Sequence, residues 1–373
     1  MLAPFLATLL FCASLGTAVH NTVNTWNGLL QYDEDWGYAD IRTGAHTFWW
    51  LYAVKPANDR PLILWLQGGP GASSTGFGNF EETGPKRMNN TDNEATWLQV
   101  ADMVYVDNPV GAGFSYVDED GSFTKNVAEI GQDLLAWLRQ FLVIHPEYRT
   151  RPFFIFCESY GGKMSAEFAR VITQEISAGN LRLDFRGVAL GDSWISAMDY
   201  VNSWGEFLYA NSYLDNNQLA RVNAQAKSCQ KKVDQGQWKQ ATTCWGNMED
   251  LIGAEDVRLN FFTTTFTKWR KSSVPTPFCC YYSLNDQVEL MNYSCQVGCT
   301  EMWMARLTWP GMASFKTAAK VKFGTKSFPL AGFKKRHENL SFYLILRGGH
   351  MVAYDTPEAA VHIVQQILKD YSS

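Results

Sequence analysis

The sequence predicts an α/β fold in which helices cover both faces of a mostly parallel central sheet. Short apolar runs, rich in β-branched and aromatic residues, alternate with longer segments whose apolar residues recur at helical spacing. This alternation is typical of strands joined by crossover helices. Three of the predicted strands end at or close to Gly68, Ser159 and Gly191. Because ligands bind at the carboxyl ends of parallel strands, we expect the functional site at these positions.

The first elements in the chain are a strand pair over residues 36–42 and 47–54, where aromatic and β-branched side chains dominate. Nearly continuous apolar runs at 61–66 and 102–107 predict two strands that are buried on both faces. Apolar residues then recur at helical spacing over 127–144, which predicts an amphipathic helix.

The alternation continues with a strand at 152–156, a helix at 163–176 and a strand at 185–190. The next stretch does not continue it, and the pattern resumes with a strand at 341–346. A helix over 357–368 is the last predicted element.

The interruption lies at residues 193–282, which are helical and irregular and contain many charged and amide side chains. We interpret it as a helical cap inserted over the site. The predicted organisation is a signal peptide at 1–18, a first core segment at 19–192, the cap at 193–282 and a second core segment at 283–373.

Composition excludes several classes of function. The chain is 46% hydrophobic and 18% charged, which is too apolar for a disordered protein. Its net charge of −5 argues against a nucleic-acid partner, because phosphate binding requires clustered Lys and Arg. The oligomeric state is left open by the sequence.

The first residues resemble a secretory signal. Residues 2–15 are almost wholly apolar, and Gly16 and Ala18 are small residues at the −3 and −1 positions of a cleavage site. A buried first helix is the alternative. No other run reaches the roughly 18 apolar residues of a membrane span. We therefore expect a protein that is secreted, or held in the lumen of the secretory or lysosomal pathway, without a membrane span.

Cysteines and sequons are consistent with an oxidising compartment. Cys229 and Cys244 are close enough in sequence to form a local disulfide. The other cysteines are irregularly spaced and lack an accompanying histidine, so we expect no metal site. Three glycosylation sequons begin at Asn89, Asn292 and Asn339.

The segment around Ser159 has the form of a nucleophile elbow, a sharp turn that exposes a catalytic serine. Ser159 lies between a predicted strand and a predicted helix, and Gly161 provides the small residue that the turn requires two positions later. Two positions earlier, Cys157 replaces the usual glycine and is small enough to fit. The positive end of the following helix would stabilise negative charge that develops at the site.

His350 is the predicted general base. It follows a predicted strand in a loop with Gly348 and Gly349, and it comes after the serine, as the chain order of hydrolase triads requires. The chain has only six histidines, and the others precede the sheet core or lie in helical or charged settings.

Several motifs together resemble the serine carboxypeptidases, in particular the retinoid-inducible branch, over residues 36–262 and from 303 onward. Gln67 and the segments at 77–85 and 187–196 are similar to that branch. The resemblance implies an α/β-hydrolase fold, with a cap shorter than is usual in the family. The four main motifs are Trp65-Leu66-Gln67-Gly68-Gly69-Pro70-Gly71, Asp107-Asn108-Pro109-Val110-Gly111, Glu158-Ser159-Tyr160-Gly161-Gly162 and Gly349-His350-Met351-Val352.

The same resemblance implies a role for each matching residue. Ser159 would attack the scissile carbonyl, and His350 would take its proton and later give it to the leaving amine. The backbone N–H groups of Gly69 and Tyr160 would form the oxyanion hole. The residues implied to bind the free carboxylate of the substrate are Gln67, Gly68, Glu82 and Glu158.

These roles predict a serine-type carboxypeptidase that releases C-terminal residues from peptides or proteins without a metal or other cofactor. A carboxyl group donates a hydrogen bond to another carboxylate only when it is protonated. Glu82 and Glu158 therefore predict an acidic pH optimum.

The third member of the triad is less clear, because the family pattern breaks after residue 262. The nearest match, at 285–291, places Glu289 at the acid position, with Asp286 as the alternative. Two functions stay open: an active carboxypeptidase with one of these acids, and a secreted non-catalytic homologue that binds peptides.

Overall fold

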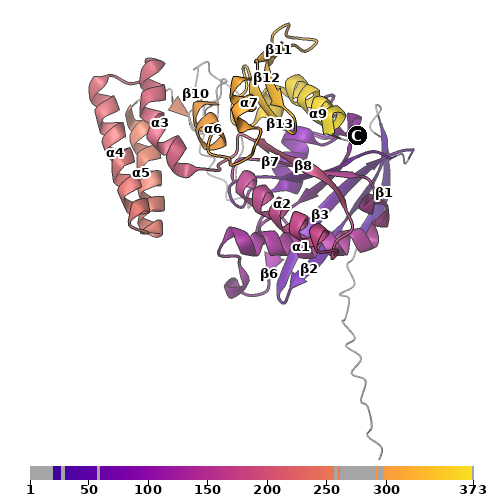
Figure 1. The fold of residues 1–373 in the computed structure, drawn as a ribbon. Helices are drawn as coiled ribbons and strands as arrows, with labels where there is room; N and C mark the ends of the chain where they lie inside the picture. Colours follow the sequence, from indigo (N-terminus) through magenta and orange to yellow (C-terminus); the bar gives the residue numbers. More distant parts are fainter. Residues whose placement is uncertain are drawn as a thin grey trace, which may run out of the picture.

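The computed structural model describes residues 20–26, 30–56, 59–255, 259–260, 291–292 and 297–371. A mixed sheet lies at the centre of the described part (Figure 1). Its strands are β1 (His20–Trp26), β2 (Gln31–Arg42), β3 (Ala45–Val54), β4 (Leu62–Leu66), β5 (Asp102–Val106), β6 (Tyr116–Val117), β7 (Pro152–Glu158) and β8 (Asp184–Gly191).

The strands are ordered β1-β2-β3-β5-β4-β7-β8, and β6 pairs with β3 outside this path. From β5 to β8 the neighbouring strands are parallel, and β1, β2 and β3 form an antiparallel flank. The predicted α/β class with a parallel centre is confirmed, and all six strands expected in this half of the chain are present. The short β6 and the first strand β1 were not predicted.

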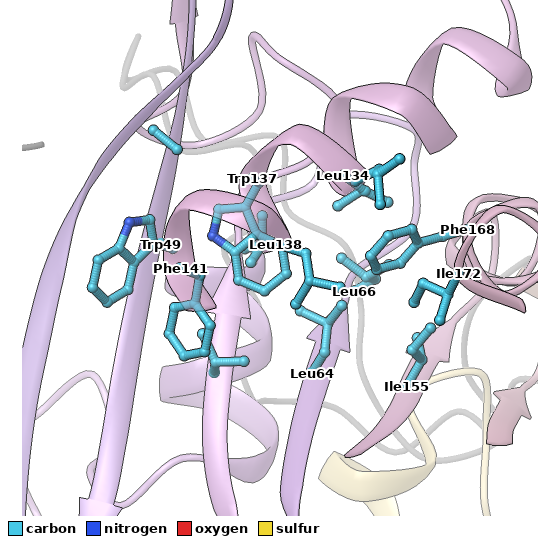
Figure 2. Packing of buried hydrophobic residues seen from close by; sticks show 14 of the residues in the cluster. Trp49, Leu64, Leu66, Leu134, Trp137, Leu138, Phe141, Ile155, Phe168 and Ile172 are labelled. Atoms are coloured by element: carbon cyan, nitrogen blue, oxygen red, sulfur yellow. The ribbon is translucent and has the colours of Figure 1, made fainter. Parts of the chain in front are cut away.

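The side chains of β4 explain why both faces of the sheet are covered. Leu62, Leu64 and Leu66 join one buried cluster, and Ile63 and Trp65 join another, because successive side chains of a strand point to opposite faces. Helices α1 (Val127–Ile144) and α2 (Gly161–Ser177) close the first face. Figure 2 shows side chains from these helices and from the strands packed together. Helices α8 (Val352–Asp355) and α9 (Pro357–Tyr371) supply apolar residues to the second face.

A helical unit follows β8, within the range of the predicted cap. It contains α3 (Ala197–Ala210), α4 (Asn216–Asp234) and α5 (Trp238–Glu255), and it lies to one side of the sheet (Figure 1). Its core includes Tyr200, Trp204 and Met248. Cys229 and Cys244 are bonded in a disulfide that joins α4 to α5, with their Cα atoms 5.4 Å apart.

The strand predicted at 341–346 is present as β13 (Leu340–Ile345), but it does not extend the central sheet among the described residues. It pairs with β12 (Gly332–His337), which also pairs with β11 (Val321–Phe323), and all three strands are antiparallel. The expectation that the parallel pattern resumes here is therefore wrong. The physical reason is a tight turn at Glu338, where a φ of 48° brings β12 and β13 together as a local hairpin.

The remaining elements are short. No helix in the described ranges combines the length and the apolar character needed to cross a bilayer. Among the sequons, Asn89 and Asn339 are exposed, and the side chain of Asn292 lies outside the described residues. The short elements are η1 (Ser74–Thr83), η2 (Trp97–Gln99), η3 (Asp120–Ser122), η4 (Pro146–Arg149), β9 (Leu259–Asn260), β10 (Met291–Asn292), α6 (Val297–Met304) and α7 (Met312–Thr317).

Candidate active site

Ser159 occupies a sharp turn between β7 and α2. Its φ of 58° lies in the left-handed region, where a residue with a side chain is strained. The turn is held by the end of β8, because the Ser159 N–H donates to Gly191 O at 3.1 Å and Trp194 N–H donates to Ser159 O at 2.8 Å. This is the geometry of the predicted nucleophile elbow, with the serine at the carboxyl end of a central strand.

The neighbours of the turn have to be small. A Cβ at Gly161 would lie 2.5 Å from Leu66 O and 3.0 Å from the Cβ of Cys157. The contact with Leu66 O shows that the end of β4 passes directly beside the elbow. Cys157 therefore fits the position where the motif usually has glycine, but it leaves no room for a side chain at Gly161.

The segment that contains Gly69 starts at this corner, where Gly68 packs against the elbow. A Cβ at Gly68 would lie 2.5 Å from Ser159 Cβ and 2.9 Å from the backbone nitrogen of Tyr160. Gly69, the next residue, has a φ of +111°, which suits glycine. The oxyanion loop (residues 68–73) thus begins against the nucleophile and the backbone nitrogen of Tyr160, and Gly69 is its second residue.

Gln67 joins the two glutamates predicted to bind the substrate carboxylate. Its Nε2 donates to Glu82 Oε1 at 3.3 Å and to Glu158 Oε1 at 3.1 Å. All three side chains are buried, although they come from the end of β4, from η1 and from the end of β7. Because Glu158 precedes Ser159 in the chain, this polar cluster lies next to the nucleophile.

Burial changes the protonation of these carboxyl groups. It raises the pKa of Glu82 above its ordinary value, against the opposing effect of the hydrogen bond from Gln67. Burial also raises the pKa of Glu158, and the negative charge of Glu82 raises it further. The pair therefore holds a proton at a pH where exposed glutamates are ionised.

Two more carboxyl groups lie close enough to act on this pair. Burial and the charge of Asp355 raise the pKa of Asp192 to about 8. The charge of Asp355 also raises the pKa of Glu82 and the pKa of Glu158. Asp355 Oδ2 accepts a hydrogen bond of 2.6 Å from the Gly349 N–H. Asp355 thus connects the loop before His350 to the region of the glutamates.

His350 is buried, with 3% of its surface exposed. It follows β13 through residues 346–349. Burial lowers the pKa of His350 to about 4, because a charged imidazolium is poorly solvated there. The imidazole is therefore neutral, and able to accept a proton, in moderately acidic solution.

The structure does not join every predicted member of the site. No hydrogen bond links the Ser159 hydroxyl to the His350 ring within the described residues. Such bonds are commonly long in unliganded enzymes and shorten when substrate binds. Glu289 and its alternative Asp286 lie outside the described residues.

Sequence reasoning gave no role to three residues near the site. Asp192 follows β8 directly, and its φ of 34° was not predictable from the sequence. Asp355 carried no signal beyond its closeness to His350 in the chain. Asp107 appeared only as part of a motif, although it is fully buried and accepts hydrogen bonds from two loops.

Comparison with known proteins agrees with this geometry. The family model described as serine carboxypeptidase matches residues 25–293 and 290–370. The mouse retinoid-inducible serine carboxypeptidase is 35% identical, and the match covers 90% of this chain and 91% of the mouse protein. Serine carboxypeptidase-like 51 of Arabidopsis thaliana is 32% identical, with 90% of this chain and 92% of that protein covered.

A solved structure supports the fold. The prohormone-processing carboxypeptidase KEX1(delta)p of Saccharomyces cerevisiae superposes with a TM-score of 0.75, covering 91% of this chain and 92% of that one, at 20% identity. The α/β-hydrolase fold is therefore confirmed. The elbow, the match along almost the whole chain and the fold agree, and this protein belongs to the serine carboxypeptidase family.

Proposed function

We propose that this protein is a serine carboxypeptidase that works in acidic solution and releases C-terminal residues from peptides through an acyl-enzyme. In this mechanism Ser159 Oγ attacks the carbonyl carbon of the last peptide bond as His350 takes the hydroxyl proton. The N–H groups of Gly69 and Tyr160 stabilise the oxyanion. His350 then gives its proton to the leaving amine, and water releases the peptide from Ser159 by the reverse sequence.

The observation that carries this proposal is the buried cluster of Gln67, Glu82 and Glu158 beside the nucleophile. An endopeptidase or an esterase has no use for two protonated glutamates at this position. A substrate with a free C-terminal carboxylate does require such groups, because each protonated carboxyl can donate a hydrogen bond to that carboxylate. The Nε2 group of Gln67 uses its two N–H bonds to hold the two carboxyl groups side by side.

Acidic pH preference follows from opposite pKa changes in one site. The glutamates keep their protons at a pH where ordinary glutamates lose them. His350 stays neutral at a pH where an ordinary histidine is charged. Donors and base are therefore both in their working forms between about pH 4 and neutrality.

Two measurements test the proposal. A fluorophosphonate should label the wild type and leave Ser159→Ala unlabelled. Peptides with a free C-terminus should lose single residues at pH 5, while the same peptides with a C-terminal amide should be cut far more slowly. A protein that binds the free peptides but is not labelled would instead be the non-catalytic homologue. Equal cleavage of both peptides would contradict the carboxylate site.

We also propose that the protein is secreted or lumenal, and that it loses about its first 18 residues. The disulfide between Cys229 and Cys244 supports an oxidising compartment. N-terminal sequencing of the mature protein tests this, and intact Met1 on a cytosolic protein would contradict it. Glycosylation at Asn89 and Asn339 is expected to shift the mass of the secreted protein.

A further inference from the structure

Asp107 is a buried carboxylate with an unusual set of partners. It follows β5 directly, and none of its surface is exposed. Its Oδ1 accepts hydrogen bonds from Ser73 Oγ at 2.8 Å and from Thr75 N–H at 3.0 Å. Its Oδ2 accepts from Thr75 Oγ1 at 2.7 Å and from Phe114 N–H at 2.9 Å. Four neutral donors thus stabilise one buried acid.

The donors belong to separate pieces of chain. Ser73 ends the oxyanion loop and caps η1, where its hydroxyl accepts from Gly76 N–H at 2.7 Å. Phe114 lies in a second loop, at residues 109–115. A Cβ at Gly113 in that loop would lie 2.0 Å from Asp107 Oδ2 and 2.6 Å from Ser73 Oγ. The second loop therefore packs tightly against the carboxylate and against the end of the oxyanion loop.

The oxyanion loop is closed by hydrogen bonds between its own two ends, and Asp107 adds a tie from its far end to β5. The loop continues from β4, and Gln67 N–H, just before it, donates to Ser74 Oγ, just after it, at 3.0 Å. Within the loop, Ala72 N–H donates to Gly68 O at 3.1 Å. Its far end is fixed to the central sheet through Ser73 and Thr75, which bond to Asp107. Gly69 lies between the two ends of the loop, with a φ of +111° that residues other than glycine rarely adopt.

We propose that Asp107 is a positioning residue for catalysis: by tying the far end of the oxyanion loop to β5, it holds the Gly69 N–H in the direction that the oxyanion requires. This inference rests on the proposed function. Asp107 does not touch the substrate, and it acts only through the loop. Catalytic hydrogen bonds to an oxyanion lose strength when the donor moves by a fraction of an ångström, and the loss of one such donor costs roughly 100- to 1,000-fold in kcat.

Thr75→Val is the test variant, because valine keeps the shape of the side chain, removes the hydroxyl bond to Asp107 Oδ2 and leaves the backbone N–H bond to Oδ1. Thr96→Val is its control. Thr96 is equally buried, and its hydroxyl bonds to Thr83 O and Leu98 N, away from the oxyanion loop. Asp107→Asn is a stronger variant, since its amide nitrogen cannot accept from two of the four donors.

Three quantities are measured for each variant: the rate constant of fluorophosphonate labelling, the affinity of a free-C-terminal peptide in a Ser159→Ala background, and the melting temperature. We expect labelling to slow roughly tenfold in Thr75→Val and a hundredfold in Asp107→Asn, because the phosphoryl oxygen occupies the oxyanion hole. Peptide affinity should stay within about twofold of wild type. Thr96→Val should lose stability and label at the normal rate.

Unchanged labelling in folded Thr75→Val overturns the inference, and so does a parallel loss of labelling, peptide affinity and stability in both threonine variants. If Asp107→Asn does not fold, Thr75→Val decides. If the wild type itself is not labelled, the proposed function fails. Amide hydrogen exchange of residues 68–77 then decides the inference separately: faster exchange in Thr75→Val than in Thr96→Val supports it, and equal exchange overturns it.

Discussion

The indole N–H of Trp65 donates to Gln67 Oε1 at 2.7 Å, and this bond determines which end of the Gln67 amide faces the glutamates. With Oε1 engaged by Trp65, Nε2 is directed at Glu82 and Glu158. Gly78 leaves room for the bond, because a Cβ there would lie 2.2 Å from the indole nitrogen. A core side chain of β4 thus sets the orientation of a group in the site.

Trp65→Phe should therefore weaken substrate binding more than the chemical step. Loss of the indole N–H leaves the buried Oε1 of Gln67 without its donor. An unsatisfied buried acceptor costs about 1–3 kcal/mol of stability, and the amide becomes free to rotate. We expect the KM for free-C-terminal peptides to rise roughly tenfold, while kcat stays within about threefold of the wild-type value. Trp97→Phe, a neighbour whose ring packs against Trp65, is the control. Equal changes in the two variants would contradict the orienting role.

Glu158→Gln should flatten the pH profile on its alkaline side. In the wild type, kcat/KM for a free-C-terminal peptide falls as pH rises, because the raised pKa of Glu158 is eventually passed and the donor is lost. A glutamine amide donates at every pH. We expect activity at pH 5 within about tenfold of wild type and a much smaller decline toward pH 8. A decline as steep as that of the wild type would rule out Glu158 as the titrating donor.

The acidic side of the profile should report His350. Its pKa is lowered to about 4, so the base is lost only as pH falls through that value. Fluorophosphonate labelling isolates this group, since the probe has no carboxylate to bind. We expect labelling to be half-maximal near pH 4 and to reach a plateau, within about two pH units above that value, that extends to neutrality. An inflection near pH 6.5, the ordinary value, would show that burial does not govern this histidine.

The glutamates should also make the protein less stable as pH rises. A carboxyl whose pKa is higher in the folded state binds more protons there than in the unfolded chain, so stability is lost above the unfolded value of roughly 4.3. The loss is about 1.4 kcal/mol per pH unit for each such group. Glu82→Gln should melt at a higher temperature than wild type at pH 7.5, with a smaller difference at pH 4.5. Exposed Glu119→Gln, which should show neither effect, is the control.

The triad acid can be identified by substitution. If Glu289 orients the His350 ring, Glu289→Gln should lower kcat by up to roughly four orders of magnitude, while Asp286→Asn stays near wild type. The reverse result would assign the role to Asp286. Unchanged activity in both variants would show that neither acid completes a triad.

The sequence predicted best what depends on a local pattern. The apolar run at β4 and the helical spacing of α1 each follow from one stretch of chain, and the elbow at Ser159 follows from its place between a strand and a helix. Family resemblance named Gln67 and the glutamates, but not the bond that orients Gln67. That bond forms only because η1 passes over Trp65 with a glycine at position 78.

Relations among distant segments were not predictable from residue patterns. The pairing of β13 with β12 follows from a turn geometry at Glu338 that the sequence does not single out. The role inferred for Asp107 depends on Ser73 and Phe114, which meet it only after folding. An acidic residue after a strand is a common feature, and only its four donors distinguish this one.

The two-sided sheet has a consequence for how the chain can be made. Ile63 and Phe154 belong to the same buried cluster as Val361, Val364 and Leu368 of α9, which follow them at a long distance in the chain. On the ribosome, where roughly 5–20 residues are added each second, this face of the sheet lacks the side chains of α9 for many seconds after α1 and α2 have been made for the other face. His350 emerges in the same late stretch. The nascent chain thus exposes apolar surface on this face over the same interval in which its candidate site is incomplete.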